Sequence, residues 1–153
     1  MAFTHIAETE LDASPEQLFD LLADVTSWPK WDDGITAIEC SEPNPRLGTI
    51  FFLTPKGGPR TKLKITEYDR PRCLADIAYL PLGQMFTRHQ LLARPNGKAA
   101  LRMTIRVSGP LGLLWNRVIA RKQIAEAAEQ AQALAAYARQ QAQVIGIEAT
   151  CVT

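Results

Sequence analysis

Few side chains in this 153-residue chain could do chemistry, and they are scattered. His5 and His89 are the only histidines, and the cysteines, Cys40, Cys73 and Cys151, contain no CxxC pair. Neither set has metal-ligand spacing, and phosphate- and dinucleotide-binding glycine motifs are absent, so we expect no metal and no cofactor. The unpaired cysteine pattern indicates a reducing compartment, and we expect a cytoplasmic protein without a disulfide framework.

His89 is the first candidate for chemistry, and its orientation depends on the pairing of two consecutive strands. The second of these, residues 98–108, alternates apolar with polar residues, so its apolar set should face the interior. The apolar set is Leu101, Met103, Ile105 and Val107. The first, residues 85–94, leads into it through Pro95, Asn96 and Gly97, and the length of this turn decides the register.

Two turns are compatible with these residues. A two-residue turn at Asn96–Gly97 would pair Pro95 with Lys98, although proline has no N–H to donate. A three-residue loop with a left-handed glycine avoids this problem and pairs His89 with Met103. This loop, which we favour, turns one set of residues inward: Thr87, His89, Leu91 and Ala93. The other register would turn the alternate set inward: Arg88 and Gln90.

An inward His89 has two interpretations. In an apolar cavity its pKa would fall, leaving a neutral imidazole that could orient a ligand or transfer a proton. Tyr79, on the preceding strand, could assist if Cys73, Ala75 and Ile77 face inward. The alternative is a buried histidine satisfied by Tyr79 or water, with the tyrosine packing the wall. His89 and Tyr79 are therefore catalytic candidates only.

The elements that must position these residues form a simple order. Residues 3–12 alternate as a strand, and Ser14, Pro15 and Gln17 form the start of a short helix with a capping box. A second short helix or turn begins at Trp28. Six further strands, separated by short turns, are predicted at 35–41, 48–55, 60–69, 73–80, 85–94 and 98–108. Strands joined by such short turns must be antiparallel.

A long helix closes the chain. From Leu111 to Gln143 the sequence is rich in alanine and nearly free of Gly and Pro, and about 30 helical residues span roughly 45 Å. Its alanine stripe either leaves room for a ligand or lets helix and sheet approach closely: positions 125, 128, 131, 135, 138 and 142. We predict an α+β fold in which a seven-stranded curved antiparallel sheet wraps around this helix. Residues 1–143 would form one domain, with a C-terminal tail at 144–153.

This order resembles the SRPBCC or START-like helix-grip superfamily, in its polyketide cyclase/dehydrase-like branch. The superfamily includes START lipid-transfer domains and the birch-pollen allergen family. The residues that carry the likeness are Leu11–Phe19, Asp24, Trp28–Trp31, Tyr68–Arg72 and Gly109–Leu111. The likeness covers about residues 3–142 and implies a mainly apolar cavity between the sheet and the long helix.

The resemblance implies three functions. The first is binding of a small hydrophobic molecule, lipid-like, aromatic or polyketide-like, without catalysis. The second is a cyclase or dehydratase that uses general acid/base chemistry in the same cavity. The third is a protein-interaction module. The expected ligand-binding residues are Ile77, Tyr79, Thr87, His89, Leu91, Met103, Ile105, Leu114, Trp115 and Val118.

Tryptophan and charge patterns each leave alternatives open. Trp28, Trp31 and Trp115 could ring the cavity entrance or pack the helices against the sheet. The net charge of +1 gives no strong field that would favour nucleic acid or an anionic membrane. No apolar run approaches 18 residues, so we expect no stable membrane insertion. However, residues 1–42 hold ten acidic and one basic residue, whereas the remainder holds six acidic and sixteen basic. This asymmetry predicts either a basic patch for an acidic ligand or cross-strand ion pairs.

Overall fold

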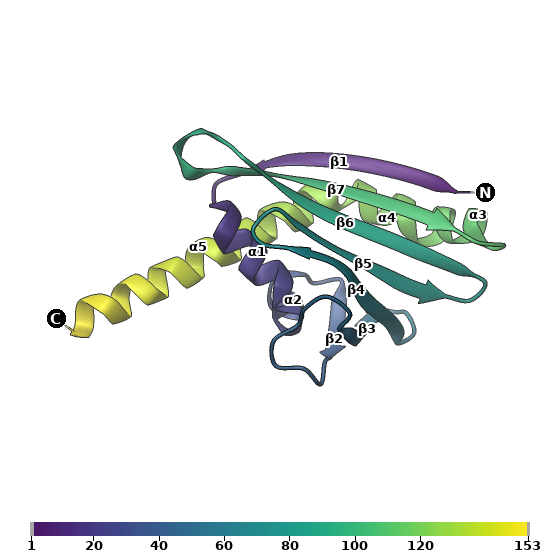
Figure 1. The fold of residues 1–153 in the computed structure, drawn as a ribbon, viewed down its shortest axis with the longest axis horizontal. Coiled ribbons are helices and arrows are strands. Elements are labelled where there is room, and N and C mark those ends of the chain that lie inside the picture. Colours follow the sequence, from purple (N-terminus) through teal and green to yellow (C-terminus); the bar gives the residue numbers. More distant parts are fainter. Residues whose placement is uncertain (1, 153) are drawn as a thin grey trace.

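A computed structural model describes residues 2–152, with side chains for residues 2–143. Seven strands form one antiparallel sheet in the order β1-β7-β6-β5-β4-β3-β2 (Figure 1). The strands are β1 (Phe3–Leu11), β2 (Ile35–Glu39), β3 (Ile50–Pro55), β4 (Thr61–Asp69), β5 (Cys73–Leu80), β6 (Gly83–Ala93) and β7 (Ala99–Ser108). The predicted fold class, with its seven-stranded antiparallel sheet, is therefore confirmed.

Short helices follow β1 and a segmented helix follows β7. The helical elements are α1 (Pro15–Ala23), η1 (Val25–Ser27), α2 (Trp28–Trp31), η2 (Pro95–Gly97), α3 (Gly112–Trp115), η3 (Asn116–Ala120), α4 (Arg121–Ala125) and α5 (Ala127–Val152). The predicted capping box starts α1: the Gln17 N–H donates to Ser14 Oγ, and the Ser14 N–H donates to Gln17 Oε1, both at 3.2 Å. No helix in the described part of the chain is long and apolar enough to cross a membrane.

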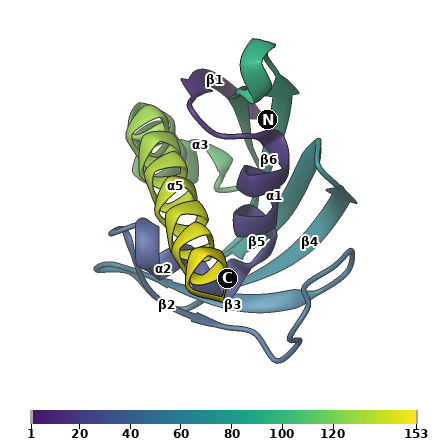
Figure 2. The same cartoon turned by 90° about the vertical axis from the view of Figure 1, so that its left-hand side faces the viewer.

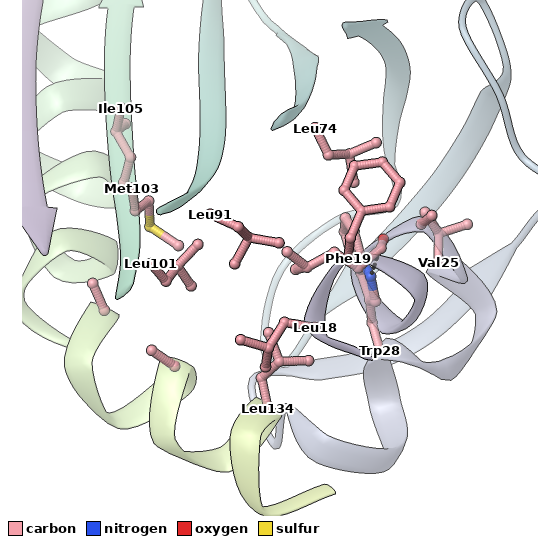
Figure 3. Packing of buried hydrophobic residues seen from close by; sticks show 14 of the residues in the cluster. Leu18, Phe19, Val25, Trp28, Leu74, Leu91, Leu101, Met103, Ile105 and Leu134 are labelled. Atoms are coloured by element: carbon pink, nitrogen blue, oxygen red, sulfur yellow. Dashed lines mark hydrogen bonds between the residues drawn. The ribbon is translucent and has the colours of Figure 1, made fainter. Parts of the chain in front are cut away.

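The sheet bends around the helices (Figure 2). Helix α5 lies along the open side of the bend, and α1 lies inside it. Leu91, Leu101 and Met103 point from the concave face toward Leu18 of α1 and Leu134 of α5 (Figure 3). One hydrophobic core therefore joins the concave face of the sheet to the helices.

The β6–β7 register matches the three-residue loop. His89 pairs with Met103, and Leu91 pairs with Leu101. Gly97 is left-handed at φ +73°, and Asn96 also has a positive φ, of +65°. Asparagine tolerates that conformation better than most residues, so the loop closes without strain at a branched side chain. The prediction that turned His89 inward is confirmed.

The closing helix is not one continuous rod, contrary to the prediction. It contains a π-helical turn at η3 and a break at Glu126 (φ −95°, ψ 0°), and α5 then continues past Gln143 to Val152. Of the predicted alanine stripe, Ala131, Ala135 and Ala138 are buried. The other members are exposed: Ala125, Ala128 and Ala142. Because the helix restarts after Glu126, its buried face begins at Ala127 and the predicted phase does not hold along its whole length.

Cross-strand pairing on the outer face of the sheet explains part of the uneven charge distribution. Glu8 of β1 lies 3.0 Å from Arg102 of β7, measured between Oε1 and Nη2. Glu10 lies 3.1 Å from the Nε of Arg94. The acidic first strand thus pairs with basic residues at the end of β6 and on β7, as the second of the two interpretations predicted.

Candidate functional site

Three polar side chains lie together on the concave face of the sheet. Asp76 of β5 pairs with Thr87 of β6, and Leu74 pairs with His89 in the same ladder. Directly paired residues of antiparallel strands point to the same face, and diagonal neighbours are close enough for long side chains to meet. Asp76, Thr87 and His89 therefore form a polar group, which we call the inner polar triad, among apolar residues.

Burial shifts the two titratable members of the triad in opposite directions. Burial raises the pKa of Asp76 from 3.8 to about 7. Burial also lowers the pKa of His89 from 6.5 to about 4, and the backbone carbonyl of Leu74 offsets this only in part. Both shifts arise because an apolar surrounding disfavours the charged form. Near neutral pH, His89 is uncharged and Asp76 exchanges between its acid and its carboxylate.

His89 lacks a partner for one ring nitrogen. Its Nδ1 is buried and has no hydrogen bond within the described part of the chain. Such orphaned buried groups are rare in folded proteins and require an explanation. Residual exposure of a few per cent also remains around it, at 7% for His89, 6% for Thr87 and 8% for Met103, whereas Phe19 is fully buried. Thr87, His89 and Met103 are therefore buried but not completely enclosed.

A second interior polar contact lies beside the triad. His5 of β1 pairs in register with Ile105, which in turn pairs with Thr87, so His5 lies on the same face. Its Nε2 lies 2.6 Å from Oδ1 of Asn116, which belongs to the π-helical turn η3. With the amide oxygen as acceptor, the imidazole N–H donates. This bond ties the helical segment to the sheet.

Two predicted site residues are on the wrong face. Tyr79 pairs with Lys62 and Gln84 on the outer face, is 40% exposed and lies 5.5 Å from the Lys62 amine. Ile77 shares that outer orientation, opposite Phe86. The prediction that both face inward is therefore wrong, and Tyr79 cannot assist His89.

The error arises at the turn between β5 and β6. A three-residue loop ending at Gly83 would pair Tyr79 with Met85, which faces inward. Instead Leu80 pairs with Gly83 across a two-residue turn, and Leu82 adopts the left-handed conformation at φ +52°. The residues of β5 that share the face of His89 are Leu74, Asp76 and Ala78. Asp76 was thus missed, although an isolated aspartate in an apolar strand was a signal to consider both registers.

The other predicted binding residues divide into two groups. Those on the concave face are Thr87, His89, Leu91, Met103 and Ile105. Leu114 and Val118, by contrast, are 46% and 54% exposed, so they do not line the interior. Trp115 is partly buried, and its Nε1 donates to the carbonyl of Pro81 at 2.8 Å. It fastens α3 to the β5–β6 turn.

The other two tryptophans belong to the short helices. Trp28 is buried, donates from Nε1 to the Leu22 carbonyl at 3.0 Å and packs edge-on against Phe51. It therefore seals α2 against the sheet. Trp31 is partly buried, and its Nε1 has no hydrogen-bond partner in the described residues.

An open groove lies at the end of the sheet and not beneath α5. It has a volume of about 550 Å³ and runs along the β5–β6 turn and the end of β7. Its lining residues are Tyr79, Leu80, Leu82, Gly83, Gln84, Ser108, Gly109 and Pro110. The groove and the inner polar triad are therefore separate features of the molecule.

Comparison with known proteins identifies the family. Residues 4–139 match the family described as polyketide cyclase / dehydrase and lipid transport. The chain belongs to this family. It therefore has the helix-grip fold of the SRPBCC superfamily, a fold that binds ligands.

Solved structures share the fold at low sequence identity. A norcoclaurine synthase from Thalictrum flavum aligns with a TM-score of 0.73 at 14% identity, over 92% of this chain and 96% of that one. Ara h 8.0201 aligns with a TM-score of 0.70 at 18% identity, over 92% and 99%. A hypothetical protein from Helicobacter pylori aligns with a TM-score of 0.68 at 14% identity, over 90% and 86%.

Curated relatives share a shorter stretch. Uncharacterized proteins from Mycobacterium bovis and Mycobacterium tuberculosis are 40% identical over 50 residues. This match spans 32% of this chain and 30% of those proteins. These relatives are themselves uncharacterized, so they indicate no activity for this chain.

Proposed function

We propose that this protein binds a small, mainly apolar molecule against the concave face of its sheet, with the inner polar triad orienting one polar group of that molecule. The observation that carries the proposal is the buried Nδ1 of His89, which has no partner among the described residues. A ligand hydroxyl, amine or carbonyl next to the triad would give the imidazole and the Asp76 carboxyl hydrogen bonds that the protein does not supply. The class of ligand is lipid-like, aromatic or polyketide-like.

Affinity and orientation would come from different groups. Burial of apolar ligand surface against Leu91, Met103 and Ile105 supplies about 25 cal/mol per Å². Specificity would come from the triad, because a few polar groups in an apolar site fix the direction of the ligand. Norcoclaurine synthase, which shares the fold, has been solved with dopamine and hydroxybenzaldehyde. Small aromatic molecules are therefore reasonable first probes.

Native mass spectrometry of the freshly purified full chain tests this proposal. We expect a retained small-molecule mass that is released on denaturation, or thermal stabilisation by a fatty acid, a sterol or a flavonoid. His89→Leu should weaken that binding about tenfold, the cost of roughly one hydrogen bond to the ligand. Gln90→Leu, one position along β6 on the outer face, is the matched control and should bind like the parent chain.

The test can also contradict the proposal. A protein that carries no small molecule and is stabilised by none of the three probes would overturn it. Equal losses from His89→Leu and Gln90→Leu would show that the triad does not orient the ligand. Recovery with a protein partner and an empty interior would favour the interaction-module alternative.

A second candidate function is acid/base catalysis of the cyclase or dehydratase type. It is favoured by the pKa of Asp76, about 7, because a carboxyl that titrates near neutral pH can both donate and accept protons. In that case Asp76→Asn would retain ligand yet abolish turnover of a polyketide-like substrate. If the protein only binds its ligand, the parent chain itself would not turn over such a substrate. The cytoplasmic location remains a prediction in either case.

A further inference from the structure

A surface of exposed leucine, valine and basic side chains lies at the end of the molecule occupied by α3 and the β5–β6 turn. Its apolar members are 46–66% exposed: Leu82, Leu113, Leu114 and Val118. Its basic members are Arg117, Arg121 and Lys122, all exposed. We call these seven residues the apolar–basic face. Exposed apolar residues that gather at one place indicate an interaction surface, whereas scattered ones do not.

The turn and the helix are fixed together, so the face is one surface. The Leu111 N–H donates to the Leu82 carbonyl at 2.9 Å, and Trp115 Nε1 donates to the Pro81 carbonyl at 2.8 Å. On the helical side, positions 113, 117 and 121 and positions 114, 118 and 122 recur every four residues. Residues four apart are neighbours on the surface of an α-helix, and here the π-helical turn η3 joins the two α-helical parts that carry them. Figure 1 shows α3 at the end of the molecule opposite the C-terminus of α5.

Leu82 adds an independent argument. It is 66% exposed and adopts a left-handed backbone at φ +52°, in a turn position that glycine or asparagine would occupy without strain. A bulky residue with positive φ is uncommon, and strained residues gather at functional sites. Neither the fold nor the core explains a leucine here. A surface that needs an apolar side chain at the tip of this turn does explain it.

Charge decides the kind of partner. Residues 77–125 contain eight basic residues and no acidic one. Four of the eight pair with carboxylates on the outer face of the sheet: Arg88, Arg94, Lys98 and Arg102. Within the side chains that the structure describes, the three cations of the apolar–basic face form no ion pair. They are available to an anionic partner.

We propose that the apolar–basic face docks this protein onto an anionic lipid surface. The leucines and Val118 would enter the boundary between headgroups and acyl chains, and Arg117, Arg121 and Lys122 would contact lipid phosphates. This combination suits a membrane surface, because the acyl boundary accepts the apolar side chains and the lipid phosphates accept the cations. The inference does not depend on the ligand bound inside.

Vesicle co-sedimentation of the full chain tests the proposal. We expect binding to vesicles of phosphatidylcholine with 30% phosphatidylserine, and at least tenfold weaker binding to pure phosphatidylcholine or in 0.5 M NaCl. Replacing all three cations of the face by glutamine should reduce binding to the level of neutral vesicles. Leu113→Ser with Leu114→Ser should weaken it at least tenfold.

Two further variants separate docking from folding. Leu82→Gly should fold at least as stably as the parent chain, since glycine relieves the left-handed strain, yet bind vesicles several-fold more weakly. Ile6→Ser removes an equally exposed apolar side chain (63%) on the outer face of β1 and should leave binding unchanged. No binding to anionic vesicles, or equal losses from Ile6→Ser and Leu82→Gly, would overturn the proposal. So would concentration-dependent dimerisation that the Leu113/Leu114 variant abolishes, since a second copy would then be the partner.

Discussion

The two faces of the same sheet treat their charged groups in opposite ways. On the outer face, Glu67 of β4 lies 3.0 Å from Arg88 of β6, and Glu8 of β1 lies 3.0 Å from Arg102. On the inner face, Asp76 and His89 form no ion pair with one another among the contacts of the structure, and each is shifted toward its neutral form.

This difference separates a structural role from a functional one. Partnered charges at a surface are held by the fold and need no ligand. Buried groups without partners reduce stability, so their presence requires another benefit. The pKa of Glu67 is lowered by its hydrogen bond to Arg88, whereas the pKa of Asp76 is raised by burial alone. Two acidic residues on adjacent strands thus have opposite shifts because one faces an arginine and the other faces the core.

The largest expected effect concerns the pH dependence of the inner triad. In the unfolded chain Asp76 ionises near pH 4 and His89 becomes protonated below about 6.5. Between these values the folded chain keeps a proton on Asp76 that the unfolded chain has lost, and lacks one on His89 that the unfolded chain holds. Their contributions to the slope of the unfolding free energy against pH are therefore opposite and nearly cancel.

Single substitutions should reveal each slope. His89→Leu leaves Asp76, whose neutral form is preferred in the folded state, so the free energy of unfolding should fall by about 3 kcal/mol from pH 4.5 to 7. Asp76→Asn leaves His89, so the free energy should rise by about 3 kcal/mol from pH 4 to 6.5. Urea denaturation across this range measures both. Parallel pH profiles for the two variants would contradict the opposite shifts.

An intermediate effect is expected at the hydrogen-bonded pair of His5 and Asn116 beside the inner polar triad. Asn116→Ala removes the 2.6 Å contact to His5 and leaves the imidazole nitrogen without it. Losing a buried hydrogen bond costs about 1–3 kcal/mol. A double-mutant cycle with His5→Ala, measured by urea denaturation, should return a coupling of about 1 kcal/mol. If the losses of unfolding free energy from the two single substitutions simply add in the double variant, the bond does not hold η3 against β1.

The elements and most of the register could be predicted from the sequence, because their signals are local. Alternation marked the strands, Ser14 and Gln17 marked the start of α1, and the missing N–H of Pro95 selected the β6–β7 loop. These features depend on a few neighbouring residues. Together they suffice to place His89 on the concave face.

The features that could not be predicted are those where the folded structure departs from the local preferences of the residues. The β5–β6 turn places Leu82 where glycine is favoured, which shifts the register by one residue and replaces Tyr79 with Asp76 on the inner face. Likewise, no Gly or Pro marks the π-helical turn at η3 or the break at Glu126. One of the three members of the inner polar triad, Asp76, therefore depended on a strained turn that sequence rules disfavour.

The smallest expected effect lies on the outer face, where the partnered charges should prove dispensable. Glu8→Gln removes the carboxylate that contacts both Arg102 and Arg94, and all three side chains are more than one-third exposed. Exposed ion pairs contribute about 0.2–1 kcal/mol, so the loss of unfolding free energy should stay below about 1 kcal/mol. It should disappear in 1 M NaCl, where the screening length is about 3 Å. A larger loss that persists in salt would mean that the outer face, too, holds its charges for more than pairing, and the contrast between the two faces would no longer single out Asp76 and His89.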